Sequence, residues 1–188
     1  MQAETATTYC HLSVDHSVLY HFSHDPHIER FVPHVPRTNP SHQPAVWAID
    51  AEHAPLYWFP RECPRIAIWP LDEDGRAAFA SRFATSAVRL HAIESVWLER
   101  MRAAEVYRYE FDADGFEPWE AATGQWICDR DVTPKSVTAV RDLLSAHADA
   151  SIELRIVPSL WPLHDVAVGG EFDFSMVRMH NAQPRVSP

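Results

Sequence analysis

Between residues 19 and 69 the sequence repeatedly places a short apolar run next to proline, histidine or arginine. The runs cover residues 19–22, 45–49 and 65–69. Runs of this length, bounded by turn-forming residues, are typical of buried strands. The aromatic, imidazole and guanidinium groups that crowd their ends are unusual for a plain core and typical of a pocket. We therefore expect two or three short strands that end at a binding site.

The rest of the chain alternates further strand patterns with a few helical ones. We expect strands at residues 18–22, 45–49, 65–69, 106–111, 125–128, 152–157 and 172–179, and helices at residues 73–83, 94–104 and 134–147. The last helix rests on Thr133 as its N-cap and Pro134 as its first residue. Because strands outnumber helices and no regular βαβ order is present, we predict an α+β fold. We expect a mixed, mostly antiparallel sheet core with about three packed helices.

Length and charge limit the organisation and the partners of the chain. With 188 residues, we expect a single globular domain over residues 16–188 after a flexible leader at residues 1–15. A net charge of -10 leaves no basic surplus to neutralise phosphates, which argues against broad binding to nucleic acid or anionic membranes. No apolar run reaches membrane-spanning length and no signal peptide opens the chain, so we predict a cytoplasmic location.

Histidines are concentrated near the start of the chain, where His21, His24 and His27 follow at intervals of three. Such a cluster is one way to build a zinc site, and a metal-dependent hydrolase is one interpretation of the sequence. However, the strand that carries His21 and the turn set by Pro26 oppose a shared face, so we expect no metal. His21 is singled out because apolar strand residues flank it, and a polar ring there needs a partner or a ligand.

Arginines and aromatic rings form the second group of candidates. Arg61 and Arg65 lie in a segment bracketed by prolines. They form either surface ion pairs with Glu62 and nearby acids or a preorganised clamp for phosphate or pyrophosphate. Core packing explains most of the aromatic residues, Trp47 among them. Tyr57 and its two aromatic neighbours cannot all face inward from one short helix at residues 51–58, so we expect a ring at a cavity or in solvent.

Several segments resemble an uncharacterised bacterial family of similar length. They begin with Leu-Tyr-His-Phe-Ser at residues 19–23, Val-Trp-Ala-Ile-Asp at 46–50 and Tyr-Trp-Phe-Pro-Arg at 57–61. The resemblance continues to Arg178 and Asn181 near the end, and therefore covers nearly the whole chain after the leader. It implies membership of a family to which no activity is assigned.

The front of the chain also resembles ADP-ribosyltransferase-like domains. In those domains a first strand ending in Tyr-His-x-Ser precedes a second strand and a short helix with an aromatic residue. The resemblance implies an ADP-ribosyltransferase-like fold and NAD as the cofactor. It implies that His21 binds the adenosine-side ribose, that Tyr57 packs on the nicotinamide end, and that Glu94 polarises the reacting ribose.

We therefore interpret the chain as an ADP-ribosyltransferase-like enzyme that acts on NAD or a related nucleotide. The alternative is a non-enzymatic module on the same fold that binds a nucleotide or a protein. The expected catalytic residues are His21, Tyr57 and Glu94, and the expected cofactor-binding residues are His21, Ser23, Trp47, Tyr57, Arg61 and Arg65. The order of the strands also predicts that His21 and Tyr57 lie on facing walls of one cleft, with Arg61 or Arg65 near its mouth.

Overall fold

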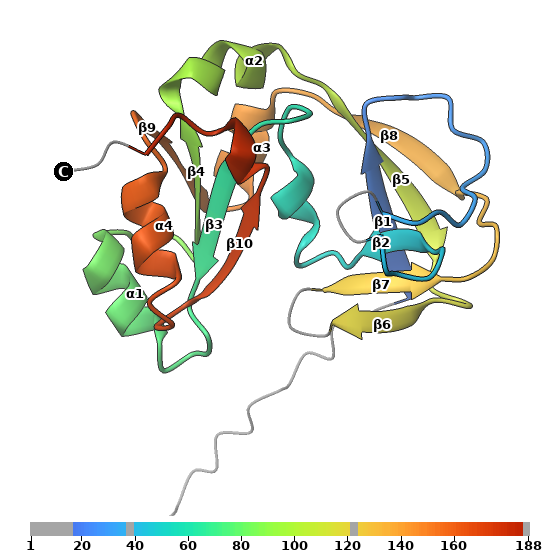
Figure 1. Ribbon diagram of the computed structural model, residues 1–188, viewed down its shortest axis with the longest axis horizontal. Helices are drawn as coiled ribbons and strands as arrows, with labels where there is room; N and C mark the ends of the chain where they lie inside the picture. Colours follow the sequence, from blue (N-terminus) through green and yellow to red (C-terminus); the bar gives the residue numbers. More distant parts are fainter. Residues whose placement is uncertain (1–16, 37–39, 121–123, 186–188) are drawn as a thin grey trace, which may run out of the picture.

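The computed structural model describes residues 17–36, 40–120 and 124–185, so the leader expected at residues 1–15 lies outside the described residues. Two β-sheets stand side by side (Figure 1). The larger sheet has the strand order β6-β7-β2-β1-β5-β8. Its strands are β1 (Val18–Ser23), β2 (Val46–Ile49), β5 (Val106–Asp112), β6 (Glu117–Glu120), β7 (Gln125–Cys128) and β8 (Ser136–Val140).

The smaller sheet has the strand order β10-β3-β4-β9. Its strands are β3 (Arg65–Trp69), β4 (Arg89–Glu94), β9 (Ile152–Val157) and β10 (Asp173–Val177). Only β4 and β9 pair in parallel among the described strands, which confirms the predicted α+β class with mostly antiparallel sheets. The two sheets are interleaved along the chain, because β3 and β4 separate β2 from β5.

Four α-helices lie among the described residues, rather than about three. They are α1 (Arg76–Phe83), α2 (Leu98–Ala103), α3 (Leu143–Asp149) and α4 (Trp161–Ala167), and short 3-10 turns are η1 (Ala54–Tyr57), η2 (Ser95–Trp97) and η4 (Met179–Asn181). In Figure 1, α1 and α4 cover the outer face of the smaller sheet. Phe79 of α1 and Leu160 before α4 pack there against Ile66 and Leu90, in one apolar cluster. None of the described helices is long and apolar enough to cross a membrane.

Strand β1 lies inside the larger sheet, where it pairs with β2 on one side and with β5 on the other. Its six residues pair in register with β5, and Leu19 is fully buried against Tyr109 and Phe111. Burying an aliphatic side chain of this size contributes about 2 kcal/mol. Pairing with β2 is much shorter and is limited to Tyr20 opposite Ile49. The strand is therefore anchored firmly along β5 and loosely along β2.

A third apolar cluster joins the two halves of the molecule. Phe59, Met101, Val106 and Leu143 come from a loop, α2, β5 and α3, and they pack together. Next to this cluster lie two buried histidines, His91 on β4 and His147 on α3. Their rings are joined by a hydrogen bond of 3.0 Å between Nε2 of His147 and Nδ1 of His91.

One expected element is wrong. The helix predicted over residues 134–147 is a strand over Ser136–Val140, and α3 begins only at Leu143. The strand pairs antiparallel with β5, and Val137 is exposed instead of packing on a helical stripe. Pairing at a free sheet edge has therefore overridden the helix-start signal. The seven expected strands are present, and β3, β7 and β9 have the expected ends. The other four strands and the helices near residues 73–83 and 94–104 have shifted ends, and β4, β6 and β8 were not among the expected strands.

Candidate functional site

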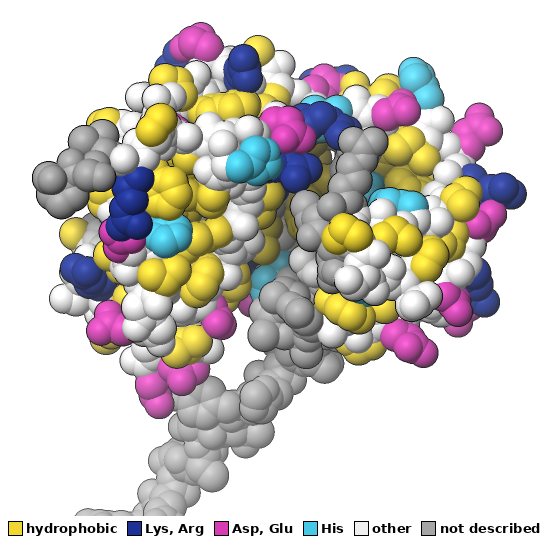
Figure 2. All heavy atoms as spheres, viewed as in Figure 1, with side chains coloured by type: hydrophobic (Ala, Val, Ile, Leu, Met, Phe, Trp, Pro, Cys, Tyr) yellow, Lys and Arg dark blue, Asp and Glu magenta, His cyan; other side chains and the backbone are white. Residues whose placement is uncertain are grey.

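Tyr57 lies where three adjoining cavities meet between the two sheets. The cavities enclose about 320, 600 and 450 Å³, each in part open to solvent, and Tyr57 contributes to the lining of all three. Figure 2 shows a hollow between the two halves of the molecule, with basic side chains at its upper end. We call the three cavities together the Tyr57 cleft.

Tyr57 ends the 3-10 turn η1, which Pro55 helps to start. Its ring stacks on Phe22 of β1, with centroids 5.8 Å apart and planes within 4°. The residue is 36% exposed. Even so, enclosure of its hydroxyl group raises the pKa of Tyr57, despite the opposing effects of Arg65 and of a hydrogen bond with Gln125. The ring thus offers a half-exposed flat surface on a fixed support.

His21 lies on β1 and holds the backbone of β2. Its Nδ1 lies 2.9 Å from the carbonyl oxygen of Trp47, and since a carbonyl only accepts, Nδ1 carries the proton in this bond. Burial lowers the pKa of His21, although the bond to Trp47 opposes that shift. The ring also packs on Phe31, with centroids 4.8 Å apart. The ring of His21 is therefore neutral at neutral pH. Its hydrogen bond to Trp47 links β1 to β2 where the backbone pairing of the two strands ends.

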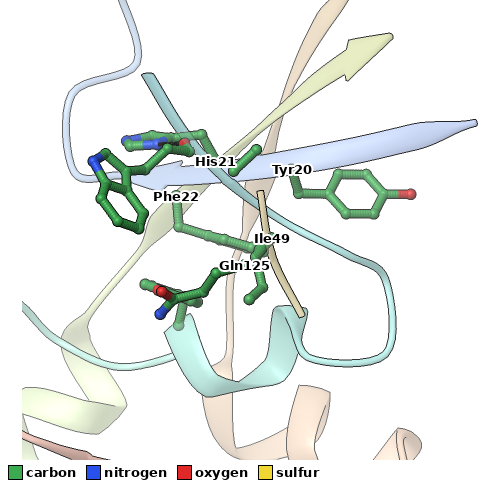
Figure 3. Close-up of a pocket in the computed structure, with 8 residues that line it drawn as sticks. Tyr20, His21, Phe22, Ile49 and Gln125 are labelled. Atoms are coloured by element: carbon green, nitrogen blue, oxygen red, sulfur yellow. Dashed lines mark hydrogen bonds between the residues drawn. The ribbon is translucent and has the colours of Figure 1, made fainter. Parts of the chain in front are cut away.

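The expectation that His21 and Tyr57 line one cleft holds for the first cavity, but their rings lie on opposite faces of β1 and do not face each other. Successive residues of a strand point to opposite faces of the sheet. Phe22 stacks on Tyr57, so His21 leaves the other face, where it meets Phe31. Figure 3 shows His21 on one side of β1 and Phe22 with Gln125 on the other. Both His21 and Tyr57 still line the first cavity, because that cavity reaches the place where β1 and β2 diverge.

Arg65 is the most buried charged side chain of the second cavity, which encloses about 600 Å³. It is 9% exposed, and its Nε and Nη1 donate to the carbonyl oxygens of Leu56 and Cys63 at 3.0 and 3.3 Å. Burial lowers the pKa of Arg65 to about 10, so the guanidinium remains charged at neutral pH. No carboxylate of the described residues forms an ion pair with it. A buried cation without such a partner is costly, which marks the position as a candidate anion site.

Three more basic side chains, His24, Arg61 and Arg178, line the same cavity. The backbone N–H of Arg61 donates to Nε2 of His24 at 3.0 Å, which fixes the loop that carries Arg61 beside the end of β1. Partial burial lowers the pKa of His24, and the charges of Arg61 and Arg65 lower it further. Arg178 reaches the cavity from the residue after β10. Sequence reasoning did not assign Arg178 to the site, because it lies far along the chain from the other two arginines.

Glu62 is the only carboxylate among the described residues that line the Tyr57 cleft. Its Oε2 lies 3.3 Å from Nε of Arg178, so the ion pair expected near Arg61 and Arg65 forms with a third arginine. Nδ2 of Asn181 donates to the backbone oxygen of Glu62 at 2.8 Å. Glu62 also has a left-handed backbone with φ of 66°, which non-glycine residues adopt at some cost. The carboxylate is therefore held in place by contacts from the C-terminal segment.

Glu94, the expected catalytic acid, is separated from the other candidates. It ends β4, is fully buried and lines none of the three cavities. Its Oε1 and Oε2 accept hydrogen bonds from the backbone N–H groups of Leu160 and Gln183, at 3.3 and 2.9 Å. Glu94 therefore connects the end of β4 to two later segments, and the structure does not bring it together with His21 and Tyr57.

The remaining expected residues lie around the cleft. Ser23 lines the second cavity, and its Oγ accepts a hydrogen bond from the backbone N–H of Asp25 at 3.1 Å. Trp47 lines the first cavity and packs on Trp119, with centroids 5.8 Å apart. No group of three histidine, cysteine, aspartate or glutamate side chains suited to a metal ion occurs in the described parts of the chain.

Fold and site define a two-sheet α+β protein with an aromatic, arginine-lined cleft between the sheets. Its sequence places it in a family: the chain belongs to DUF6886, a family of unknown function that matches residues 20–182. No curated protein matches the chain. No solved structure matches it either, so the resemblance to ADP-ribosyltransferase-like domains has no support from a structural neighbour.

Proposed function

We propose that this protein binds NAD or a related nucleotide in the Tyr57 cleft. The observation that carries the proposal is the buried guanidinium of Arg65, which has no carboxylate partner among the described residues and lines two of the three cavities. A phosphate group would supply the missing negative charge through charge-assisted hydrogen bonds. Arg61 and Arg178 line the same cavity and favour a pyrophosphate over a single neutral group.

Flat rings next to the arginines favour a nucleotide over a simple anion. Tyr57 is half-exposed and stacks on Phe22 from one side, which leaves its other surface for a base or a nicotinamide ring. Phe174 and Trp69 line the adjoining third cavity. An elongated ligand with a central pyrophosphate and rings at its ends matches this arrangement of charge and aromatic surface.

Cleavage of bound NAD is a second candidate function, and Glu62 favours it. In such a reaction the bond between the nicotinamide nitrogen and the ribose carbon breaks, and nicotinamide leaves with the bonding electron pair. A nearby carboxylate stabilises the positive charge that develops on the ribose, and a water molecule then adds to the ribose carbon and loses a proton to give ADP-ribose. Glu62 is fixed by Arg178 and Asn181 in a left-handed backbone conformation. Strained backbone held by its surroundings is often found at functional sites. This assigns the acid role to Glu62 in place of Glu94.

Calorimetric titration with NAD, ADP-ribose and AMP tests the binding proposal. We expect saturable binding that weakens about tenfold or more in Arg178→Gln and Tyr57→Ala, since each removes a charged or stacking contact. The matched control is Arg102→Gln, which removes an exposed arginine of α2 that pairs with Glu99. Equal loss of affinity in the control would show nonspecific charge attraction, and absence of any nucleotide binding would end the proposal.

Release of nicotinamide from NAD tests the enzyme. We expect Glu62→Gln to lower the rate of release by about 100-fold or more while binding is retained, because the carboxylate acts mainly on the transition state. Glu94→Gln is the paired comparison and is expected to keep the rate. If no nicotinamide is released while nucleotides still bind, the protein is a binding module. If only Glu94→Gln lowers the rate, the assignment to Glu62 is wrong.

A further inference from the structure

A fourth cavity lies outside the Tyr57 cleft, and it is larger than each of the three cavities of the cleft. It encloses about 1240 Å³, in part open to solvent, and its walls come from η1, the end of β3 and the starts of β4, β9 and β10. Its lining includes the imidazole of His53, the indole of Trp69 and the guanidinium of Arg89. Pro55 and Ile152 add an apolar wall. Trp69 is shared with the third cavity of the Tyr57 cleft, whereas His53 and Arg89 are not.

His53 is held rigidly by a carboxylate behind it. Oδ1 of Asp50 lies 2.8 Å from both the backbone nitrogen and Nδ1 of His53, and both residues are buried. Because the carboxylate accepts from Nδ1, this hydrogen bond selects the imidazole tautomer with its lone pair on Nε2. Among the described residues, the ring of His53 forms a hydrogen bond only with Asp50. The ring therefore brings an oriented acceptor to the cavity that it lines.

Gly124 holds this pair from behind. It has φ of +66°, and a Cβ at this position would overlap with the ring of His53 and the carboxylate of Asp50. Its carbonyl oxygen accepts the backbone N–H of Asp50 at 3.0 Å. The backbone thus packs directly on the pair, so that the imidazole is fixed by packing as well as by hydrogen bonds. Fixed side chains on a rigid support are what a binding site requires.

Arg89 is the second polar group, and it is 6% exposed. Its guanidinium lies over the ring of Trp69, 4.6 Å from the centroid, and Nη1 donates to the carbonyl oxygen of Glu52 at 3.0 Å. No carboxylate of the described residues lies within ion-pair distance of the guanidinium, and among these residues its only hydrogen bond is the one to Glu52. A buried cation with donors left over is a strong site for a carboxylate.

The rim of the cavity selects against ligands with several negative charges. Four acids line it, namely Glu52, Asp72, Glu73 and Asp173. Glu73 pairs with Arg76 at 2.9 Å, which leaves three carboxylates at the entrance against the single cation inside. Like charges would repel phosphates or nucleotides there. A ligand with one negative charge on an otherwise neutral body is compatible with both the rim and Arg89.

We propose that this cavity is a second ligand site, which binds a small planar monocarboxylate that carries a hydroxyl or amine donor. The carboxylate binds Arg89, the donor binds Nε2 of His53, and the planar body lies along Pro55 and Ile152. The site differs from the Tyr57 cleft in charge and in its polar residues, so it stands whether or not the cleft binds nucleotides.

The probe is 4-hydroxybenzoate, which has one carboxylate and one hydroxyl donor on a flat ring. We expect saturable shifts of the His53 ring resonances in NMR titrations of the full chain, with a dissociation constant of about 1 mM. Benzoate lacks the donor, 4-hydroxybenzyl alcohol lacks the carboxylate, and inorganic phosphate lacks the ring. We expect each to bind about tenfold more weakly or not at all.

Variants separate this site from its surroundings. His53→Gln and Arg89→Gln are expected to weaken binding about tenfold or more, whereas Arg102→Gln on α2, outside the cavity, and Tyr57→Ala in the cleft are expected to keep it. Circular dichroism checks each fold, and if Arg89→Gln unfolds, His53→Gln and the probe series decide. The proposal is overturned if no probe shifts His53, if phosphate binds as well as 4-hydroxybenzoate, or if Tyr57→Ala alone removes binding.

Discussion

Acid should destabilise this protein through the buried pair His91 and His147. The rings are 0% and 1% exposed and share the 3.0 Å hydrogen bond. Burial lowers the pKa of His91 well below 6.5, and the charges on His147, Arg89 and Arg65 lower it further. Burial also lowers the pKa of His147, while its bond to the carbonyl oxygen of Leu143 opposes the shift. The folded protein therefore keeps both rings neutral at a pH where the unfolded chain binds protons.

The sign and size of the effect follow from proton linkage. Below pH 6.5 the unfolded chain binds more protons than the folded protein, so stability falls as the pH falls toward the folded pKa values. Each histidine contributes up to about 1.4 kcal/mol per pH unit over that range. Between about pH 7.5 and about pH 5.5, we expect the pair to lower the free energy of unfolding by about 1.4 to 2.7 kcal/mol.

Urea unfolding across this pH range measures the effect, with fluorescence of the tryptophans as the signal. We expect His91→Leu to reduce the pH dependence of the free energy of unfolding by about half, because leucine cannot bind a proton. The double variant with His147→Leu should remove most of this dependence. The stability of the double variant at neutral pH should change little, because replacing both partners of a buried polar pair by apolar residues often leaves the free energy of unfolding nearly unchanged. The exposed His180→Gln is the control. An unchanged slope in the double variant would refute the argument.

Three further outcomes follow from packing and polar contacts. Gly124→Ala should lower the free energy of unfolding by about 2 kcal/mol or more in urea titrations, because of its positive φ and the overlap with His53; an effect below about 0.5 kcal/mol would contradict it. Glu94→Gln should cost about 2 kcal/mol through a lost charge-assisted hydrogen bond, while nucleotide affinity measured by calorimetry stays the same. Leu19→Ala should cost about 2 to 5 kcal/mol in the same urea assay, with an m-value close to wild type; a smaller loss would mean that the site collapses around the missing side chain.

Local patterns carried most of the strand prediction. The runs at residues 65–69 and 152–157 coincide with β3 and β9, because short apolar runs bounded by turn residues have few alternatives. The pattern failed at residues 134–147, where Thr133 and Pro134 suggested a helix start. The β-branched residues of β8 instead pair with β5, a contact far away in sequence that no local signal reveals.

The candidate site was only partly accessible from the sequence. Tyr57 and Arg65 do line one cleft, as short aromatic and proline-bracketed segments suggested. Because side chains alternate along β1, His21 and Phe22 point to opposite faces of the sheet. The sequence does not show which of these faces η1 covers after β2, and in the structure it is the face of Phe22. Glu94 resembled an exposed acid at a helix start, whereas tertiary contacts bury it. The spacing of Asp50 and His53, three residues apart across the start of η1, allows the carboxylate to accept from both the backbone nitrogen and the ring of His53.

The interleaving of the two sheets has a consequence for how the chain folds as it is made. The chain passes from one sheet to the other between β2 and β3, between β4 and β5 and between β8 and β9. Strands β3 and β4 therefore leave the ribosome long before their outer neighbours β9 and β10 at residues 152–177. Until those residues arrive, two apolar strands have open edges, which are prone to mispairing. Synthesis of the last quarter of the chain thus closes the smaller sheet.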